Sequence, residues 1–154
     1  MRMPFHIVIY KTFSAQRARV RPFLTSIGLS PGQPKVLTLL YTAGSRNQKE
    51  LADACEIDPA TMSKLLCGME RAGLISREVM ESNKRAVRVC ITAKGRRLHE
   101  QVAGHVDEVE AGALAGFSEE ERRLFREYLC RMYRNLTGND MEKGGLSDGG
   151  ENCL

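Results

Sequence analysis

Residues 47–97 carry the pattern that most constrains what this chain of 154 residues can fold into. Two short amphipathic helix patterns stand about one turn apart, and the second opens with Asp58 as a good N-cap and Pro59 in the first turn. Two β-like runs then flank a polar, basic tip, and Thr92 begins a further helix. Elements in this order outline a winged helix-turn-helix, which places one helix in a DNA groove and a hairpin beside it.

Six helices and one two-stranded hairpin are expected in all, which makes the chain mainly α-helical with a small β component (α+β). Capping boxes at Asn47–Glu50 and Ser118–Glu121 start two of the helices. Pro22 predicts a kink or a break in the first helix. The expected helices span about residues 5–27, 32–43, 48–55, 59–72, 93–115 and 119–136, and the expected strands span 74–80 and 86–91.

Apolar residues at regular spacing predict which sides of these elements are buried. The third helix should bury Leu51 and Ala54. The second strand alternates in the manner of a half-buried edge, with Val87, Val89 and Ile91 on one face and Arg88 and Cys90 on the other. The fourth helix should pack inward through Met62, Leu65, Leu66 and Met69. Its opposite face then presents Ala60, Ser63, Lys64, Cys67 and Arg71, with Thr61 near the helix start.

The outward face of the fourth helix suits contact with DNA. A helix in the major groove reads base edges with residues near its N-terminus, and its first N–H groups can hold a phosphate. Thr61, Ser63 and Lys64 stand at such positions, and Gln48 on the preceding helix is a candidate phosphate contact. Taken singly, a Ser or Thr in a first turn is usually a local cap, and a Lys is usually solvated.

The basic hairpin tip suits the minor groove beside that helix. This groove is narrow and electronegative over A·T tracts, where Arg is favoured. The tip residues are Asn83, Lys84 and Arg85. Arg77 and Arg88, on the two strands, are candidates for the flanking phosphates. The alternative is a polar hairpin tip that happens to be basic, but its place directly after the candidate reading helix favours DNA.

Charge is distributed unevenly along the chain, although the formal net charge is only +4. Residues 1–49 hold eight Lys or Arg and no Asp or Glu, and residues 71–97 hold eight more against two Glu. Basic segments on both sides of a reading helix attract phosphate. No window approaches the ~18 apolar residues of a membrane span, and the N-terminal apolar run is too brief for a secretory signal, so a cytoplasmic location is expected.

Three stretches together carry a resemblance to a known family. They are GLSPGQPKVLTLL (28–40), QKELADACEIDPATMSKLLCGMERAGLISR (48–77) and NKRAVRVCITAKGRRL (83–98). In combination with the helix order, they make the chain similar to the multiple antibiotic resistance regulator (MarR) family of bacterial transcription factors. The resemblance covers roughly residues 5–137.

The resemblance implies a homodimer in which the first, fifth and sixth helices of both chains intertwine. Residues 1–30 and 93–137 would be the dimerisation helices, residues 31–92 the DNA-binding domain, and residues 138–154 a tail whose composition predicts disorder. The dimer would bind a pseudo-palindromic operator with half-sites about one helical turn apart. Members usually repress, and are released by a phenolic or lipophilic ligand, by metal or by cysteine oxidation.

The chain departs from the family pattern in two places. The family's wing usually carries an Asp that orients the groove-entering Arg, whereas here Asn83 precedes Arg85, and an amide holds a guanidinium more weakly than a carboxylate does. The peroxide-sensing branch carries its reactive Cys near the start of the first helix, whereas Cys55 is the first Cys here. That sensing mechanism is therefore not supported.

Other groups give weaker indications. Phe13, Phe23, Tyr41 and His99 could line an effector pocket, although apolar residues at helical spacing are more often core. Cys67 or Cys90 could be a thiol switch, but a free Cys is more often a small hydrophobe. Five widely spaced Cys and three separated His give no metal-site pattern, and we expect no metal, no cofactor and no catalysis. The rival function is a winged-helix adaptor whose hairpin docks another protein.

Overall fold

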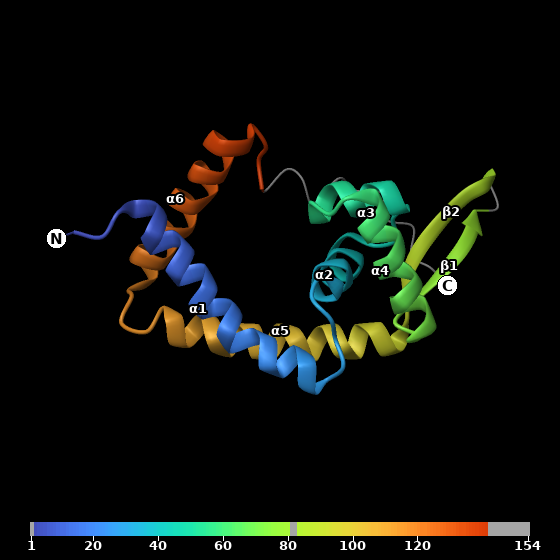
Figure 1. The fold of residues 1–154 in the computed structure, drawn as a ribbon, viewed down its shortest axis with the longest axis horizontal. Helices are drawn as coiled ribbons and strands as arrows, with labels where there is room; N and C mark the ends of the chain where they lie inside the picture. The colour runs from blue at the N-terminus through green and yellow to red at the C-terminus, as the bar shows by residue number, and fades with distance from the viewer. Residues whose placement is uncertain (1, 81–82, 142–154) are drawn as a thin grey trace.

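The computed structural model describes the backbone of residues 2–80 and 83–141, and Figure 1 shows its arrangement. Its elements are α1 (Phe5–Ser26), α2 (Gln33–Ala43), α3 (Gln48–Cys55), α4 (Pro59–Arg71), β1 (Ile75–Met80), β2 (Asn83–Ile91), α5 (Ala93–Ala113) and α6 (Glu119–Thr137). Helices α2, α3 and α4 and the hairpin gather at one end, α1 lies along α5, and α6 turns away at the other end (Figure 1). The predicted fold class is confirmed. None of the described helices is long and apolar enough to cross a membrane.

Helix α1 runs through Pro22 without interruption, so the predicted break is wrong. The helix ends one turn later in a motif that satisfies its last carbonyls. Gly28 adopts φ 75°, its N–H bonds the Thr25 carbonyl at 3.1 Å, and the Leu29 N–H bonds the Leu24 carbonyl at 2.9 Å. A side chain at residue 28 would be strained in this left-handed conformation. The expected end of the helix at this glycine is confirmed.

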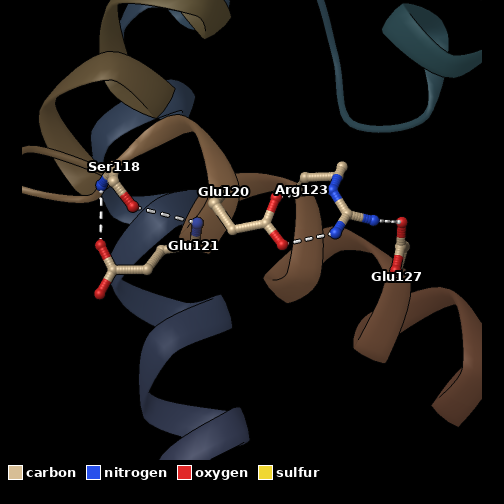
Figure 2. Close-up of polar contacts among 5 residues, drawn as sticks. All are labelled: Ser118, Glu120, Glu121, Arg123 and Glu127. Atoms are coloured by element: carbon tan, nitrogen blue, oxygen red, sulfur yellow. Dashed lines mark hydrogen bonds and ion pairs between the residues drawn. The ribbon is translucent and has the colours of Figure 1, made fainter.

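Both predicted capping boxes are present. The Asn47 side chain accepts from the Glu50 N–H at 2.9 Å, while the Glu50 carboxylate accepts from the Asn47 N–H at 2.8 Å. Ser118 and Glu121 make the same reciprocal pair at the start of α6 (Figure 2). These bonds satisfy N–H groups that a helix start otherwise leaves without partners. They explain why the sequence predicted the starts of α3 and α6 so well.

The core lies within the winged helix-turn-helix. Three of the four apolar residues predicted for the inner side of α4 are fully buried, namely Met62, Leu66 and Met69, and Leu65 is half-buried. They meet buried residues of α2 and α3, which are Val36, Leu37, Leu40, Leu51, Ala52 and Cys55. The predicted burial of Ala54 is wrong, because α3 turns Leu51 and Cys55, one helical turn apart, toward the core.

The hairpin differs from its predicted pattern at two positions. Strand β2 is antiparallel to β1, with Ile75 opposite Ile91. Val87 is 44% exposed, although an inward face was predicted, because it lies beyond the part of the hairpin that reaches the core. Cys90 is only 2% exposed, although an outward face was predicted. The base of the hairpin is therefore enclosed on both faces, which an alternating pattern does not reveal.

A polar junction fastens the start of α5 to the end of α4. The Thr92 N–H bonds the Leu74 carbonyl at 3.1 Å, and the Thr92 hydroxyl donates to the Gly73 carbonyl at 2.7 Å. The Lys94 ammonium donates to the Ala72 carbonyl at 2.8 Å. Carbonyls that the C-terminus of α4 would otherwise leave unsatisfied are thus bonded by residues at the start of α5. The junction fixes the direction in which α5 leaves the end of the molecule that holds α4 and the hairpin.

The junction also requires a glycine at residue 95. The Gly95 N–H bonds the Thr92 hydroxyl at 3.1 Å, which caps α5. A Cβ atom added to Gly95 would lie 2.2 Å from the Leu74 carbonyl oxygen and 2.9 Å from a side-chain carbon of Ile91. Because the first contact is with backbone, it has no flexible side chain to move aside. The close approach of two chain segments therefore explains the glycine of the T-A-K-G sequence.

Two glycine substitutions should have opposite effects on stability. Gly95→Ala should lower the free energy of unfolding by about 1–3 kcal/mol, because of the clash with Leu74. Gly68→Ala should raise it by about 1 kcal/mol, because Gly68 lies within α4 and a Cβ there meets nothing within 4 Å. Denaturant unfolding of both variants at one protomer concentration measures the pair. A stable Gly95→Ala variant would contradict the close approach.

Candidate DNA-binding surface

Helix α4 directs one face into the core and the opposite face to solvent. Its N-cap is Asp58, whose carboxylate accepts the Thr61 N–H at 2.9 Å, and hydrogen bonds from the Thr61 hydroxyl and then from its N–H lower the pKa of Asp58. Thr61 as a whole is exposed. The predicted contact residues Ala60, Thr61, Lys64 and Arg71 are all exposed, and Ser63 is half-buried. Gln48, also half-buried, is the first residue of α3.

Basic groups gather where α4 ends and β1 begins. The Arg71 Nε donates to the Cys67 carbonyl at 3.4 Å. The Arg77 guanidinium lies 3.8 Å from the Cys67 Sγ and makes a 3.6 Å ion pair with Glu70. All four side chains are substantially exposed, so this ion pair is weak and a phosphate could compete with it. Arg71 and Arg77 therefore share one exposed corner of the surface.

Arg88 is placed differently from Arg77. It is half-buried, and its Nη1 donates to the Ser45 carbonyl at 2.9 Å. The neighbouring Arg46 pairs with Val89 through two backbone hydrogen bonds of 3.2 and 2.8 Å. The loop between α2 and α3 is thereby joined to the edge of β2, a pairing that the sequence did not predict. Phosphate contact by Arg88 stays a prediction, with one side of the guanidinium already engaged.

The predicted wing tip is shorter than expected. Strand β2 begins at Asn83 rather than at Ala86, and Met80 pairs with Asn83 after a register shift. The backbone of Asn83, Lys84 and Arg85 therefore belongs to the strand. Their side chains, and residues 81–82, lie outside what the structure describes. The role of these three residues in the minor groove stays a prediction.

The four predicted pocket residues do not form one group. Tyr41 of α2 and His99 of α5 contact each other, with ring centroids 4.3 Å apart. Phe23 instead stacks on His105, also at 4.3 Å. Phe13 is 55% exposed and lies ten residues before Phe23 on the same helix, a separation of about 15 Å. Only Tyr41 and His99 are thus brought together, and effector binding by these residues stays a prediction.

His99 is the buried polar residue at the contact between α2 and α5. It is 9% exposed, and its Nδ1 lies 3.4 Å from the Thr38 hydroxyl. Burial lowers the pKa of the imidazole, while the neighbouring Glu100 charge raises it by less. Within the described residues, no three His, Cys, Asp or Glu side chains are grouped to hold a metal ion.

One concave feature beside α4 was missed by the sequence reasoning. A hollow of about 300 Å³ separates the start of α2 from α4. Its lining residues are Ser30, Gln33, Thr61, Lys64, Leu65 and Gly68. A signal was available, because Ser30 and Gln33 have the spacing of a capping box. The structure forms half of that box, with the Ser30 N–H bonding the Gln33 Oε1 at 2.9 Å.

The fold and this surface define a winged helix-turn-helix protein, and the comparisons with known proteins agree. A model of the MarR family matches residues 29–87. The HTH-type transcriptional repressor YetL of Bacillus subtilis is 32% identical over 113 residues, which cover 71% of this chain and 67% of YetL. The HTH-type transcriptional regulator YdgJ of the same organism is 30% identical over 129 residues, which cover 84% of this chain and 79% of YdgJ.

Solved structures extend the similarity to the fold. A MarR family protein from Bacillus stearothermophilus superposes with a TM-score of 0.74 at 27% identity, covering 86% of this chain and 92% of that one. The chain belongs to the MarR family. It is therefore a member of a family of DNA-binding transcriptional regulators, as the resemblance implied.

Acidification should lower stability through His99. Burial lowers the pKa of this imidazole in the folded state, so the unfolded chain takes up a proton first as the pH falls below the ordinary value of 6.5. The stabilising contribution is complete above that pH and is lost below it. His99→Gln should therefore lose less stability than the parent between about pH 7.5 and about pH 5.5. Denaturant unfolding at both pH values tests this, with exposed His6→Gln as the control, and equal losses in parent and His99→Gln would contradict it.

Proposed function

We propose that this protein is a transcriptional repressor that responds to a ligand and binds a pseudo-palindromic operator as a homodimer. One observation carries the DNA-binding part. The outward face of α4, from Ala60 to Cys67, is exposed, hydroxyl-bearing and basic, and holds no carboxylate. A protein-docking adaptor would not need such a face, and the transcriptional regulators among the relatives favour DNA as the partner.

Each contact residue has a chemical role in this proposal. Ala60 meets a thymine methyl, while Thr61, Ser63 and Lys64 reach base edges or phosphates in the major groove. Flanking phosphates are held by Gln48, Arg71, Arg77 and Arg88. The minor groove is entered from the wing by Asn83, Lys84 and Arg85. Sequence is read by α4, and the surrounding basic groups fix its register.

Dimerisation is supported by apolar surface that the single chain leaves exposed. Neither α1 nor α6 has a buried residue, although both are rich in large apolar side chains. The most exposed of these on the two helices are Phe5 (69%), Tyr10 (68%), Phe13 (55%), Tyr128 (54%) and Leu136 (76%). Exposed apolar surface of this kind on two helices marks an interface. We assign residues 1–30 and 93–137 to dimerisation and residues 31–92 to DNA binding.

Helix α6 carries the apolar band on one side and a polar, charged face on the other. Arg123 bridges Glu120 and Glu127 at 2.6 and 2.5 Å, as Figure 2 shows. Its position on the helix is about half a turn away from the band that includes Phe125 and Leu129. The charged ladder therefore faces away from the proposed interface, and these two sides of α6 offer a matched test.

A small phenolic or lipophilic effector would complete the regulator. The contact between Tyr41 and His99 joins the DNA-binding part to α5, so a ligand there would act on both. We assign no catalytic activity and no cofactor, in line with relatives that are regulators. A protein that binds chromosomal operators works in the bacterial cytoplasm.

Removing single contacts should weaken operator binding. Lys64→Ala and Arg85→Ala should each cost about 1–3 kcal/mol of binding free energy, because each removes a cation from a groove or a phosphate. Arg123→Ala, which removes a positive charge from the face of α6 away from the apolar band, should bind like the parent. Fluorescence anisotropy with a duplex from the upstream region, across a salt series, measures all three. If both variants match the parent, the assigned contacts are wrong.

A charge placed in the apolar band should dissociate the dimer. Leu129→Glu should raise the dimer dissociation constant by at least ~100-fold, because a buried carboxylate would lack a partner. Arg123→Ala on the opposite face should leave it unchanged. Sedimentation velocity across a concentration series compares the two variants. Unchanged dimerisation of Leu129→Glu would show that α6 is not at the interface.

A further inference from the structure

The hollow between α2 and α4 presents polar donors beside the DNA-reading face. It is lined on one side by Ser30 and Gln33 and on the other by Thr61 and Lys64. Thr61 and Lys64 are exposed on the same helix whose outward face is proposed to enter the major groove. Whatever occupies the hollow therefore lies at the margin of the DNA-binding surface.

Gln33 is the residue that gives this hollow its chemistry. Only 9% of its surface is exposed, and its Oε1 is fixed by the Ser30 N–H at 2.9 Å. Because the carbonyl side is fixed, the amide NH2 is held in a set orientation. Within the described part of the chain, this NH2 has no hydrogen-bond partner, and it is not sealed from solvent. A donor held in this way takes its acceptor from outside the chain, either water or a bound group that displaces the water.

The surroundings select an anionic acceptor. None of the six lining residues is acidic, and Lys64 supplies a positive charge. Helix α2 starts at this place with its positive dipole end, although the Gln33 N–H already bonds the Ser30 carbonyl at 3.2 Å and Pro34 has no N–H. The Asp58 carboxylate near Thr61 is already engaged with the Thr61 N–H. Donors, a cation and a helix start together are the features that bind a phosphate.

We propose that the hollow is a seat for one phosphate of the DNA backbone, held by the Gln33 amide and the Lys64 ammonium. This inference rests on the proposed DNA-binding function and adds α2 to the surface that touches DNA. The phosphate is gripped between α2 and α4, so the contact sets how deeply and at what angle α4 enters the groove. It carries no sequence information of its own.

Gln33→Glu is the sharpest test of this seat. The carboxylate keeps an acceptor for the Ser30 N–H, but it replaces the NH2 donor with a negatively charged oxygen. Operator affinity should fall at least tenfold, since hydrogen bonds to charged groups are worth more than neutral ones and repulsion is added. The loss should be similar for operator and unrelated duplex. Gln101→Glu makes the same charge change at an exposed position of α5; it should bind like the parent, and sedimentation velocity checks that it dimerises like the parent.

Two measurements keep the test independent of folding and charge. Gln33→Met removes the donor without adding charge, and should weaken binding in the same direction by a smaller factor. Duplexes with a neutral methylphosphonate at one symmetric pair of positions should identify the phosphate. With that pair alone, the difference in DNA affinity between Gln33→Glu and Gln101→Glu should largely disappear, because the neutral methylphosphonate no longer repels the carboxylate.

The outcomes separate this inference from the proposed function. If the parent and Gln101→Glu bind no duplex, the proposed function fails and this inference fails with it. If the parent binds and Gln33→Glu binds equally well, only this inference is overturned. A free anion is the other source of the same chemistry. Two results together would indicate a free anion and overturn the backbone contact. First, no methylphosphonate pair would remove the difference in affinity between Gln33→Glu and Gln101→Glu. Second, inorganic phosphate at constant ionic strength would displace DNA from the parent but not from Gln33→Glu.

Discussion

The close packing of α5 against the end of α4 is the constraint on which the rest of the structure depends. Thr92 bonds the Gly73 and Leu74 carbonyls, and Gly95 lies so near the Leu74 oxygen that a methyl group has no room. The junction satisfies the end of one helix with the start of the next. It therefore leaves little freedom between α4, the proposed DNA-reading helix, and the long helix that leads toward the proposed interface.

Local signals predicted most of the fold, and tertiary packing accounts for the rest. The capping boxes at Asn47 and Ser118 fixed two helix starts because both partners lie within four residues of each other. The buried face predicted for α3 was wrong at Ala54, because a helix of eight residues is too short for its apolar pattern to define a face. The outward orientation predicted for Cys90 was wrong because an alternating pattern indicates one buried face. It cannot show that the base of a hairpin is enclosed on both faces.

The candidate site was predictable only where local sequence patterns define it. The outward face of α4 follows from its inward stripe, so Thr61 and Lys64 could be placed from periodicity alone. The capping-box spacing of Ser30 and Gln33 was visible in the sequence, but the hollow was not, because it arises from the meeting of α2 with α4 across more than 25 residues of sequence. Tyr41 and His99 contact each other, whereas Phe23 stacks on His105 because α1 lies along α5, and the Phe13 ring contacts Arg17 of its own helix.

The junction also limits how an effector can act on DNA binding. Helix α5 has 21 residues and is about 31 Å long, which is close to the ~34–36 Å between operator half-sites. Because α4 is fastened to its start, a tilt of α5 moves α4 as a body. In the proposed dimer, a small tilt in both chains changes the separation of the two α4 helices. His99, through its contacts with Thr38 and Tyr41, braces α5 against α2 and resists such a tilt. A ligand that displaced His99 from these contacts would therefore change the separation of the two α4 helices without touching α4.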